Sequence, residues 1–201
     1  MASRKHQQTS LEQAGMEKHP FHSATLKLEE VPAVSKLRLH SLMDDPLRGS
    51  HSYSPGAETG SSSGDDPAIL CLRPREWLLL SESIAAQRLQ QQIEELVDSA
   101  QSATLDASDG LALFRLAGPG APWLLSKLSC LDFLAGRNYG RHCARTKMGH
   151  IAVIVHYHQP RGDQFVFDLI FDRSLASYLW LLLTESAGHA DELAKTYGDL
   201  K

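Results

Sequence analysis

The chain has 201 residues, a net charge of −4 and three cysteines. This length suffices for one domain with a sizeable core, and the charge gives no basic field for nucleic acid or an anionic membrane. The most apolar run, Tyr178–Leu183, is far shorter than the ~20 residues of a membrane span. The sequence shows neither a secretory signal nor a paired cysteine motif. We therefore expect a cytoplasmic protein.

The N-terminal third divides by composition. Residues 1–22 are polar and lack periodicity, which predicts a disordered tail. Leu26–Leu39 alternates apolar and polar residues around Pro32, which predicts an extended arm within residues 23–43. Such an arm needs a surface to lie on, either its own domain or another chain. Residues 44–66 are rich in Ser, Gly and Pro, which predicts a flexible linker.

The globular domain is expected over residues 67–188. Ala68–Leu72 and Glu76–Leu80 read as two strands of a hairpin, joined by the Arg-Pro-Arg turn between them. A helix over Ile84–Ala100 follows, with apolar residues at helical spacing.

The central unit begins at Asp109-Gly110, a dipeptide that favours a tight hairpin turn. Leu111–Leu116 then alternates as a strand and Trp123–Leu128 forms a short amphipathic helix. Between them, Gly118-Pro119-Gly120 makes a sharp corner. A phosphate loop at this corner is disfavoured because no Lys-Ser/Thr follows and the proline removes an amide donor.

The C-terminal third is predicted as three strands and a helix. Cys143–His158 reads as a strand pair broken near Gly149, and residues 165–170 alternate as a further strand. Ser174 can cap a last helix that ends at Gly188, with residues 189–201 as a charged tail. These six strands and three helices predict an α+β fold: an antiparallel sheet of repeated β-β-α units, with helices on one face, preceded by the arm.

Histidines and a cysteine within residues 142–158 are the first candidates for chemistry. His156 and His158 share a strand face with His150 nearby, but a metal site needs a third ligand and none stands at a standard spacing. His142 and Cys143 are adjacent on a strand, so they point to opposite faces and cannot readily form a nucleophilic dyad. The sequence therefore assigns no catalytic, cofactor-binding or metal residue.

Charged residues in the apolar strands form the second group. Asp168 and Asp172 lie in the last strand; Asp168 either faces outward or is buried with a raised pKa. Arg115 is the one charge in the central strand, so either its stem reaches an edge or it pairs with a carboxylate at a subunit interface. Arg141 and Arg145 could extend a basic rim there.

Three stretches carry a resemblance to a known family: Leu28–Pro32 with Leu37–Leu39, Arg73–Leu79, and Asp109–Ala121 running into Leu124–Asp132. On the basis of these stretches, residues 23–187 resemble the gamma subunit of heterotetrameric sarcosine oxidase. Supporting similarity lies at Arg141–Thr146, Phe167–Leu169, Arg173-Ser174 and Trp180. The chain departs from that family's pattern at Arg48–Asp66.

The resemblance implies a reduced form of the fold of the folate-binding domain of glycine-cleavage T proteins. It also implies a non-catalytic subunit that supports a heterotetrameric complex in sarcosine catabolism and one-carbon metabolism. The partners would be the larger alpha and beta flavoprotein subunits and the delta subunit. FAD, FMN, NAD and tetrahydrofolate would belong to those subunits, and this chain would bind none of them.

A partner surface is predicted from Arg115 and from the apolar residues of the arm, which are Leu26, Leu28, Val31, Leu37 and Leu39. Two other functions stay open. One is a free-standing folate-binding or one-carbon domain, in which Asp168 among Phe165, Phe167 and Phe171 would bind the pterin. The other is a protein-interaction adaptor unrelated to the enzyme.

Overall fold

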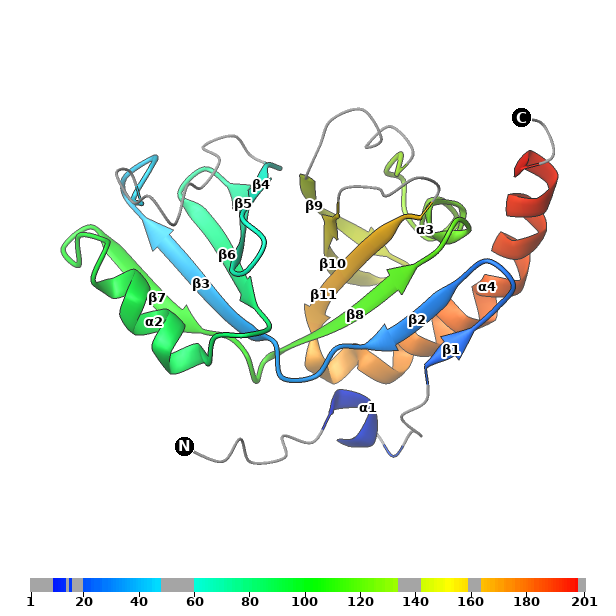
Figure 1. Ribbon diagram of the computed structural model, residues 1–201, viewed down its shortest axis with the longest axis horizontal. Helices are drawn as coiled ribbons and strands as arrows, with labels where there is room; N and C mark the ends of the chain where they lie inside the picture. Colours follow the sequence, from blue (N-terminus) through cyan, green and yellow to red (C-terminus); the bar gives the residue numbers. More distant parts are fainter. Residues whose placement is uncertain are drawn as a thin grey trace.

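Two antiparallel sheets divide the strands of the chain between them (Figure 1). The computed structural model describes residues 9–13, 15, 20–47, 60–133, 142–158 and 164–198, with side chains up to residue 188. Within these residues the chain forms eleven strands and four α-helices, so the predicted α+β class and antiparallel pairing are confirmed.

The larger sheet has six strands in the order β1 (Phe21–His22), β2 (Lys27–Glu30), β8 (Leu111–Ala117), β11 (Val166–Asp172), β10 (Ile151–Tyr157) and β9 (His142–Met148). The smaller sheet has five, in the order β4 (Ser62–Ser63), β5 (Ala68–Arg73), β6 (Glu76–Ser81), β3 (Ser35–Ser41) and β7 (Ser102–Asp106). The helices are α1 (Ser10–Gln13), α2 (Ala86–Glu94), α3 (Ala121–Leu128) and α4 (Ala176–Gly198), the last preceded by a 3₁₀ turn, η2 (Arg173–Leu175).

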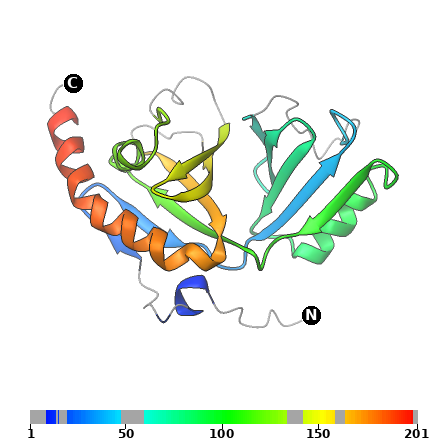
Figure 2. The ribbon, with the colours of Figure 1, turned by 180° about the vertical axis from the view of Figure 1, so that it is seen from behind.

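In the described part of the chain, three apolar cores lie between the layers. One core lies between the sheets and takes residues from both, among them Leu70 and Leu80 of the smaller sheet and Leu113 and Ile170 of the larger one. A second core joins the outer face of the larger sheet to α1, α3 and α4, and Figure 2 shows α4 lying across that face. A third joins the smaller sheet to α2. Each sheet thus has helices on one face, as predicted, and the other sheet on its second face.

The segment predicted as an arm is built into both sheets. Val31–Val34 carries the chain from β2 in the larger sheet to β3 in the smaller one, and Ala107–Gly110 carries it back from β7 to β8. The Asp109-Gly110 turn therefore links two sheets, and the predicted tight hairpin there is wrong. β2 pairs with β8, and β3 pairs with both β6 and β7. The extended conformation was predicted correctly, and the surface it lies on is its own domain.

The described residues near each end of the chain form more regular structure than the sequence predicted. The carboxylate of Glu30 accepts hydrogen bonds from the backbone N–H of Ser10 at 2.8 Å and of Leu11 at 3.2 Å, and Leu11 is buried. These contacts bind α1 to β2 and overturn the prediction of a disordered tail for residues 10–13. At the other end α4 continues past Gly188 to Gly198, because a glycine inside a helix weakens it without having to end it.

Smaller differences have local causes. The predicted helix over residues 84–100 ends at Glu94, because Asp98 accepts a hydrogen bond from the N–H of Ala100 at 2.9 Å and forms a turn that leads into β7, a strand that was not predicted. Asp172, not Ser174, caps the last helical segment, since its side chain accepts from the Ser174 N–H at 2.9 Å. In the predicted linker, Ser62–Ser63 pairs with β5, and residues 48–59 lie outside the described residues.

Candidate functional site between the sheets

A row of polar side chains crosses the inner face of the larger sheet. Strand register places Arg115 of β8 opposite Asp168 of β11, and Asp168 opposite His156 of β10. Directly opposite residues on neighbouring strands share a face. Leu113 and Ile170, two positions away on the same strands, lie in the core between the sheets. The polar row therefore points into the space between the two sheets.

Arg115 has its carboxylate partners inside the chain. Its Nε donates to Asp168 Oδ1 at 2.7 Å and its Nη2 to Asp168 Oδ2 at 2.9 Å, which is a bidentate pair. The same Nη2 donates to Glu82 Oε1 at 2.8 Å, which links the larger sheet to the segment after β6. His158 Nε2 lies 2.7 Å from Asp168 Oδ2. A carboxylate of another subunit was one expected partner for Arg115, whereas in this structure Asp168 of the same chain pairs with it.

The pairing decides how these groups ionise. Burial alone would raise the pKa of Asp168, but hydrogen bonds and charge from His158 and Arg115 outweigh it and lower the pKa to about 2. The hydrogen bond and charge of Asp168 raise the pKa of Arg115 above its ordinary value, against the opposing effect of burial. Asp168 is thus a buried carboxylate that stays ionised, contrary to the raised pKa considered from the sequence.

A cavity of about 260 Å³ opens beside this row, lined from both sheets. Its charged walls are four carboxylates and one guanidinium, those of Asp65, Asp66, Glu82, Asp168 and Arg115. The two histidines, His156 and His158, complete the polar wall, and the remaining wall is aliphatic. The excess of carboxylates favours a cation over an anion in this space.

The aromatic pocket imagined around Asp168 is not formed. Phe165, Phe167 and Phe171 belong to the core under the helices, on the opposite face of the sheet. Asp168 points instead toward Arg115 and His158. Neighbouring residues of a strand point to opposite faces of the sheet, so the phenylalanines close to Asp168 in sequence do not surround its carboxylate. The geometry removes the pterin site that the folate-binding alternative required.

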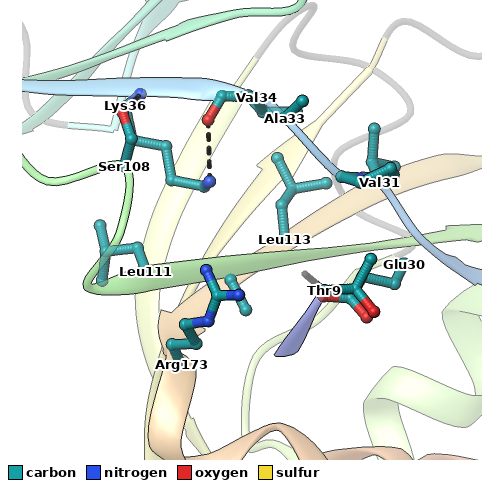
Figure 3. Close-up of a pocket in the computed structure, with 12 residues that line it drawn as sticks. Thr9, Glu30, Val31, Ala33, Val34, Lys36, Ser108, Leu111, Leu113 and Arg173 are labelled. Atoms are coloured by element: carbon teal, nitrogen blue, oxygen red, sulfur yellow. Dashed lines mark hydrogen bonds between the residues drawn. The ribbon is translucent and has the colours of Figure 1, made fainter. Parts of the chain in front are cut away.

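A second, smaller cavity of about 30 Å³ lies where the chain crosses between the sheets, and Figure 3 shows Lys36 and Arg173 reaching into it. Lys36 is buried, and its Nζ donates to the carbonyl of Val34 at 2.9 Å. Burial, reinforced by the charge of Arg173, lowers the pKa of Lys36 to about 8. Carboxylates nearby, including that of Glu30, act in the opposite direction.

Two further sequence candidates, Cys143 and Arg145, have hydrogen-bond partners within the chain. Cys143 is buried, and burial raises its pKa to about 12, so its thiol stays protonated at neutral pH. Arg145 donates to the buried carboxylate of Glu76 at 2.5 Å and joins β9 to β6. Arg141 lies outside the described residues.

The Gly118–Gly120 corner has a structural explanation. Gly118 has φ of +121°, and a Cβ there would lie 2.2 Å from the carbonyl oxygen of Thr25. The N–H of Gly120 donates to that same oxygen at 3.2 Å, and the N–H of Gly118 donates to Phe165 O at 2.9 Å. These amides are already bound, so the corner packs against the segment before β2 and does not form a phosphate loop.

The apolar residues predicted to meet a partner serve the chain's own cores. Leu26 and Leu28 lie in the core under α3 and α4, and Leu37 and Leu39 in the core under α2. Val31 is half-buried and packs at the edge of the core between the sheets. A partner interface at this segment stays a prediction.

Sequence reasoning named four of the seven polar residues that line this cavity, which are Arg115, His156, His158 and Asp168, and it placed only the two histidines together. Asp168, His156 and Arg115 meet through strand register, which periodicity alone does not give. Asp65, Asp66 and Glu82 were missed, because they precede β5 or follow β6 in the other sheet. The one available signal was the odd placement of three polar residues in otherwise apolar strands.

The described part of the chain contains no helix long and apolar enough to cross a membrane. Among solved structures, the fold is similar to a chain of heterotetrameric sarcosine oxidase from Corynebacterium sp. U-96, in complex with pyrrole 2-carboxylate. That match has a TM-score of 0.73 at 20% identity and covers 92% of this chain and 97% of the other.

The fold is also similar to glycine cleavage system aminomethyltransferase T from Bartonella henselae, with a TM-score of 0.56 at 12% identity. That match covers 80% of this chain and 45% of the transferase, which shows the fold relation that the resemblance implied. No curated protein sequence matches significantly. Residues 53–189 match the profile of the sarcosine oxidase gamma subunit family. The chain therefore belongs to the sarcosine oxidase gamma subunit family.

Proposed function

We propose that this chain is the non-catalytic small subunit of a heterotetrameric, sarcosine oxidase-type flavoenzyme. The observation that carries the proposal is the family match over residues 53–189, which takes in β4 to β11, from both sheets, and the first part of α4. The similarity in fold to nearly the whole of one chain of a heterotetrameric sarcosine oxidase supports it.

In this function the chemistry belongs to the partners. The alpha and beta flavoprotein subunits and the delta subunit would hold FAD, FMN, NAD and tetrahydrofolate, and the assembled cytoplasmic enzyme would oxidatively demethylate sarcosine. The contribution of this chain is a rigid surface. Three separate apolar cores and ion pairs that join the sheets, such as Arg115–Glu82 and Arg145–Glu76, fix that surface.

Co-expression with candidate alpha, beta and delta subunits tests the proposal. We expect the chain to co-elute with them and native mass spectrometry to give one copy in a four-subunit complex. Neighbouring genes that encode flavin oxidase subunits would supply the partners. Elution of this chain alone, with a complete and active flavoenzyme forming without it, would reject the proposal.

The crossing between the sheets is the proposed contact within this assembly. Pro32 and Ala33 are exposed there beside half-buried Val31, the one predicted apolar interface residue that keeps accessible surface. Val31→Glu should weaken co-elution and leave the isolated chain folded by circular dichroism. Leu105→Glu, at a 60% exposed position on the edge strand β7, is the matched control. If both variants co-elute as well as the parent, the interface does not include Val31.

A further inference from the structure

Three metal-binding side chains come together at the wall of the cavity between the sheets. A ring nitrogen of His156, a ring nitrogen of His158 and a carboxylate oxygen of Asp168 lie within 4.8 Å of one another. The centroids of the two imidazole rings are 4.5 Å apart. β10 and β11 hold this arrangement, because His156 pairs in register with Asp168 and His158 follows on the same face.

We propose that His156, His158 and Asp168 bind a divalent transition-metal ion of the Zn²⁺ class. Two imidazoles and one carboxylate are an established donor set for such ions. Bond lengths of about 2.0–2.2 Å place tetrahedral donors roughly 3.3 Å apart. The three donors already lie within 4.8 Å of one another, so small side-chain rotations would bring them to that spacing.

Ion binding replaces one hydrogen bond. Asp168 Oδ2 and His158 Nε2, now 2.7 Å apart, would both turn toward the ion, and the neutral imidazole would carry its proton on Nδ1. The bidentate contact of Arg115 with Asp168 persists, since each carboxylate oxygen has a second lone pair. Arg115 then holds the ligating carboxylate in orientation, as the outer partners of metal ligands do.

The charge and access of the cavity fit a cation. The guanidinium of Arg115 is offset by Glu82 at 2.8 Å, and Asp65 and Asp66 add negative charge to the same walls. The side chain of His158 is 35% exposed, which gives the ion a route from solvent. With three protein ligands, the fourth coordination position faces the cavity of about 260 Å³ and can take water or a small anionic ligand.

Zinc titration of the full-length chain, stripped with a chelator, tests the site. We expect one tight site by calorimetry, and four-coordinate absorption bands when Co²⁺ replaces Zn²⁺. His156→Gln and His158→Gln should each weaken binding about 100-fold or more and abolish those bands. The chain has ten histidines, so a matched control is needed. His150→Gln, at an exposed turn position, should bind like the parent.

Footprinting with diethyl pyrocarbonate needs no variant and so does not depend on their folding. Zn²⁺ should protect His158 from modification and leave His150 reactive. Absence of tight binding, unchanged binding in His158→Gln, or equal modification of His158 with and without Zn²⁺ would each overturn the proposal. Because these readouts use the chain alone, they are independent of whether it assembles with flavoprotein subunits.

Discussion

Replacing Arg115 by methionine should destabilise the isolated chain. Methionine keeps most of the aliphatic stem and removes the guanidinium, so Asp168 loses both hydrogen bonds from Arg115 and remains almost fully buried. Leaving one member of a buried ion pair without its partner typically costs ~3–5 kcal/mol. The side chain of Arg115 is 24% exposed, which lowers the expected cost to about 2–4 kcal/mol. For a chain of this size that corresponds to a fall in Tm of roughly 5–15 °C.

The pH dependence gives this prediction its sharpest test. The pKa of Asp168 in the folded chain is about 2, below its ordinary value of 3.8. A lowered carboxyl pKa stabilises the fold above the ordinary value, and that stabilisation is lost as the pH falls through the folded pKa. The variant loses the part of this contribution that comes from Arg115 and keeps the part that comes from His158. The difference in unfolding free energy between parent and variant should therefore be largest at pH 7 and shrink between pH 4 and pH 2.

Urea denaturation from pH 7 down to pH 2 measures that difference. The control is Arg75→Met, because Arg75 pairs with Asp44 at 3.1 Å with both side chains more than half exposed, and such pairs contribute ~1 kcal/mol or less. If Arg115→Met matches Arg75→Met in stability at pH 7 but impairs co-elution with partner subunits, the reasoning fails and Arg115 serves an interface.

Three further predictions follow from the cores and the buried side chains. Lys36→Met should stabilise the chain at pH 7 by up to about 3 kcal/mol, because the lysine pKa of about 8 lies below the ordinary 10.5. The parent should gain stability as the pH rises from about 8 to 10.5, and the variant should not. Denaturation at several pH values measures both effects. A variant less stable than the parent at pH 7 would contradict the reasoning. Leu28→Ala should cost ~2–5 kcal/mol in the isolated chain, since Leu28 is fully buried; a loss below 1 kcal/mol by denaturation would argue against its place in the core. A thiol reagent should modify exposed Cys130 in the native chain within minutes and reach buried Cys143 only on unfolding, as peptide mass analysis would show.

Local sequence patterns predicted most of the secondary structure, because strands, helices and turns depend largely on residues close in sequence. The β5–β6 hairpin, β8 and the corner before α3 follow from alternation and from Gly and Pro positions. The division into two sheets was not predictable in this way. Pro32 marks the break between β2 and β3, but no pattern says that the two strands enter different sheets.

The candidate site was less predictable than the fold. Asp168 was recognised as an unusual charge, and its environment was inferred from the phenylalanines adjacent in sequence, which lie on the opposite face. Its actual contacts, Arg115 and His158, depend on which strands pair and in which register. Sequence spacing therefore showed two potential metal ligands, and tertiary structure supplied the third.

The path of the chain through both sheets has a consequence for synthesis on the ribosome. β2 and β3 emerge first, yet Leu28 of β2 pairs with Leu116 of β8, roughly 90 residues later. At ~5–20 residues per second, the early strands would wait roughly 5–20 s for that partner. Formation of such non-local pairs is slow, and unpaired apolar strands are prone to aggregate while they wait. Expression yield should therefore respond to chaperone supply and to translation speed between β3 and β8, even where the stability of the finished fold is unchanged.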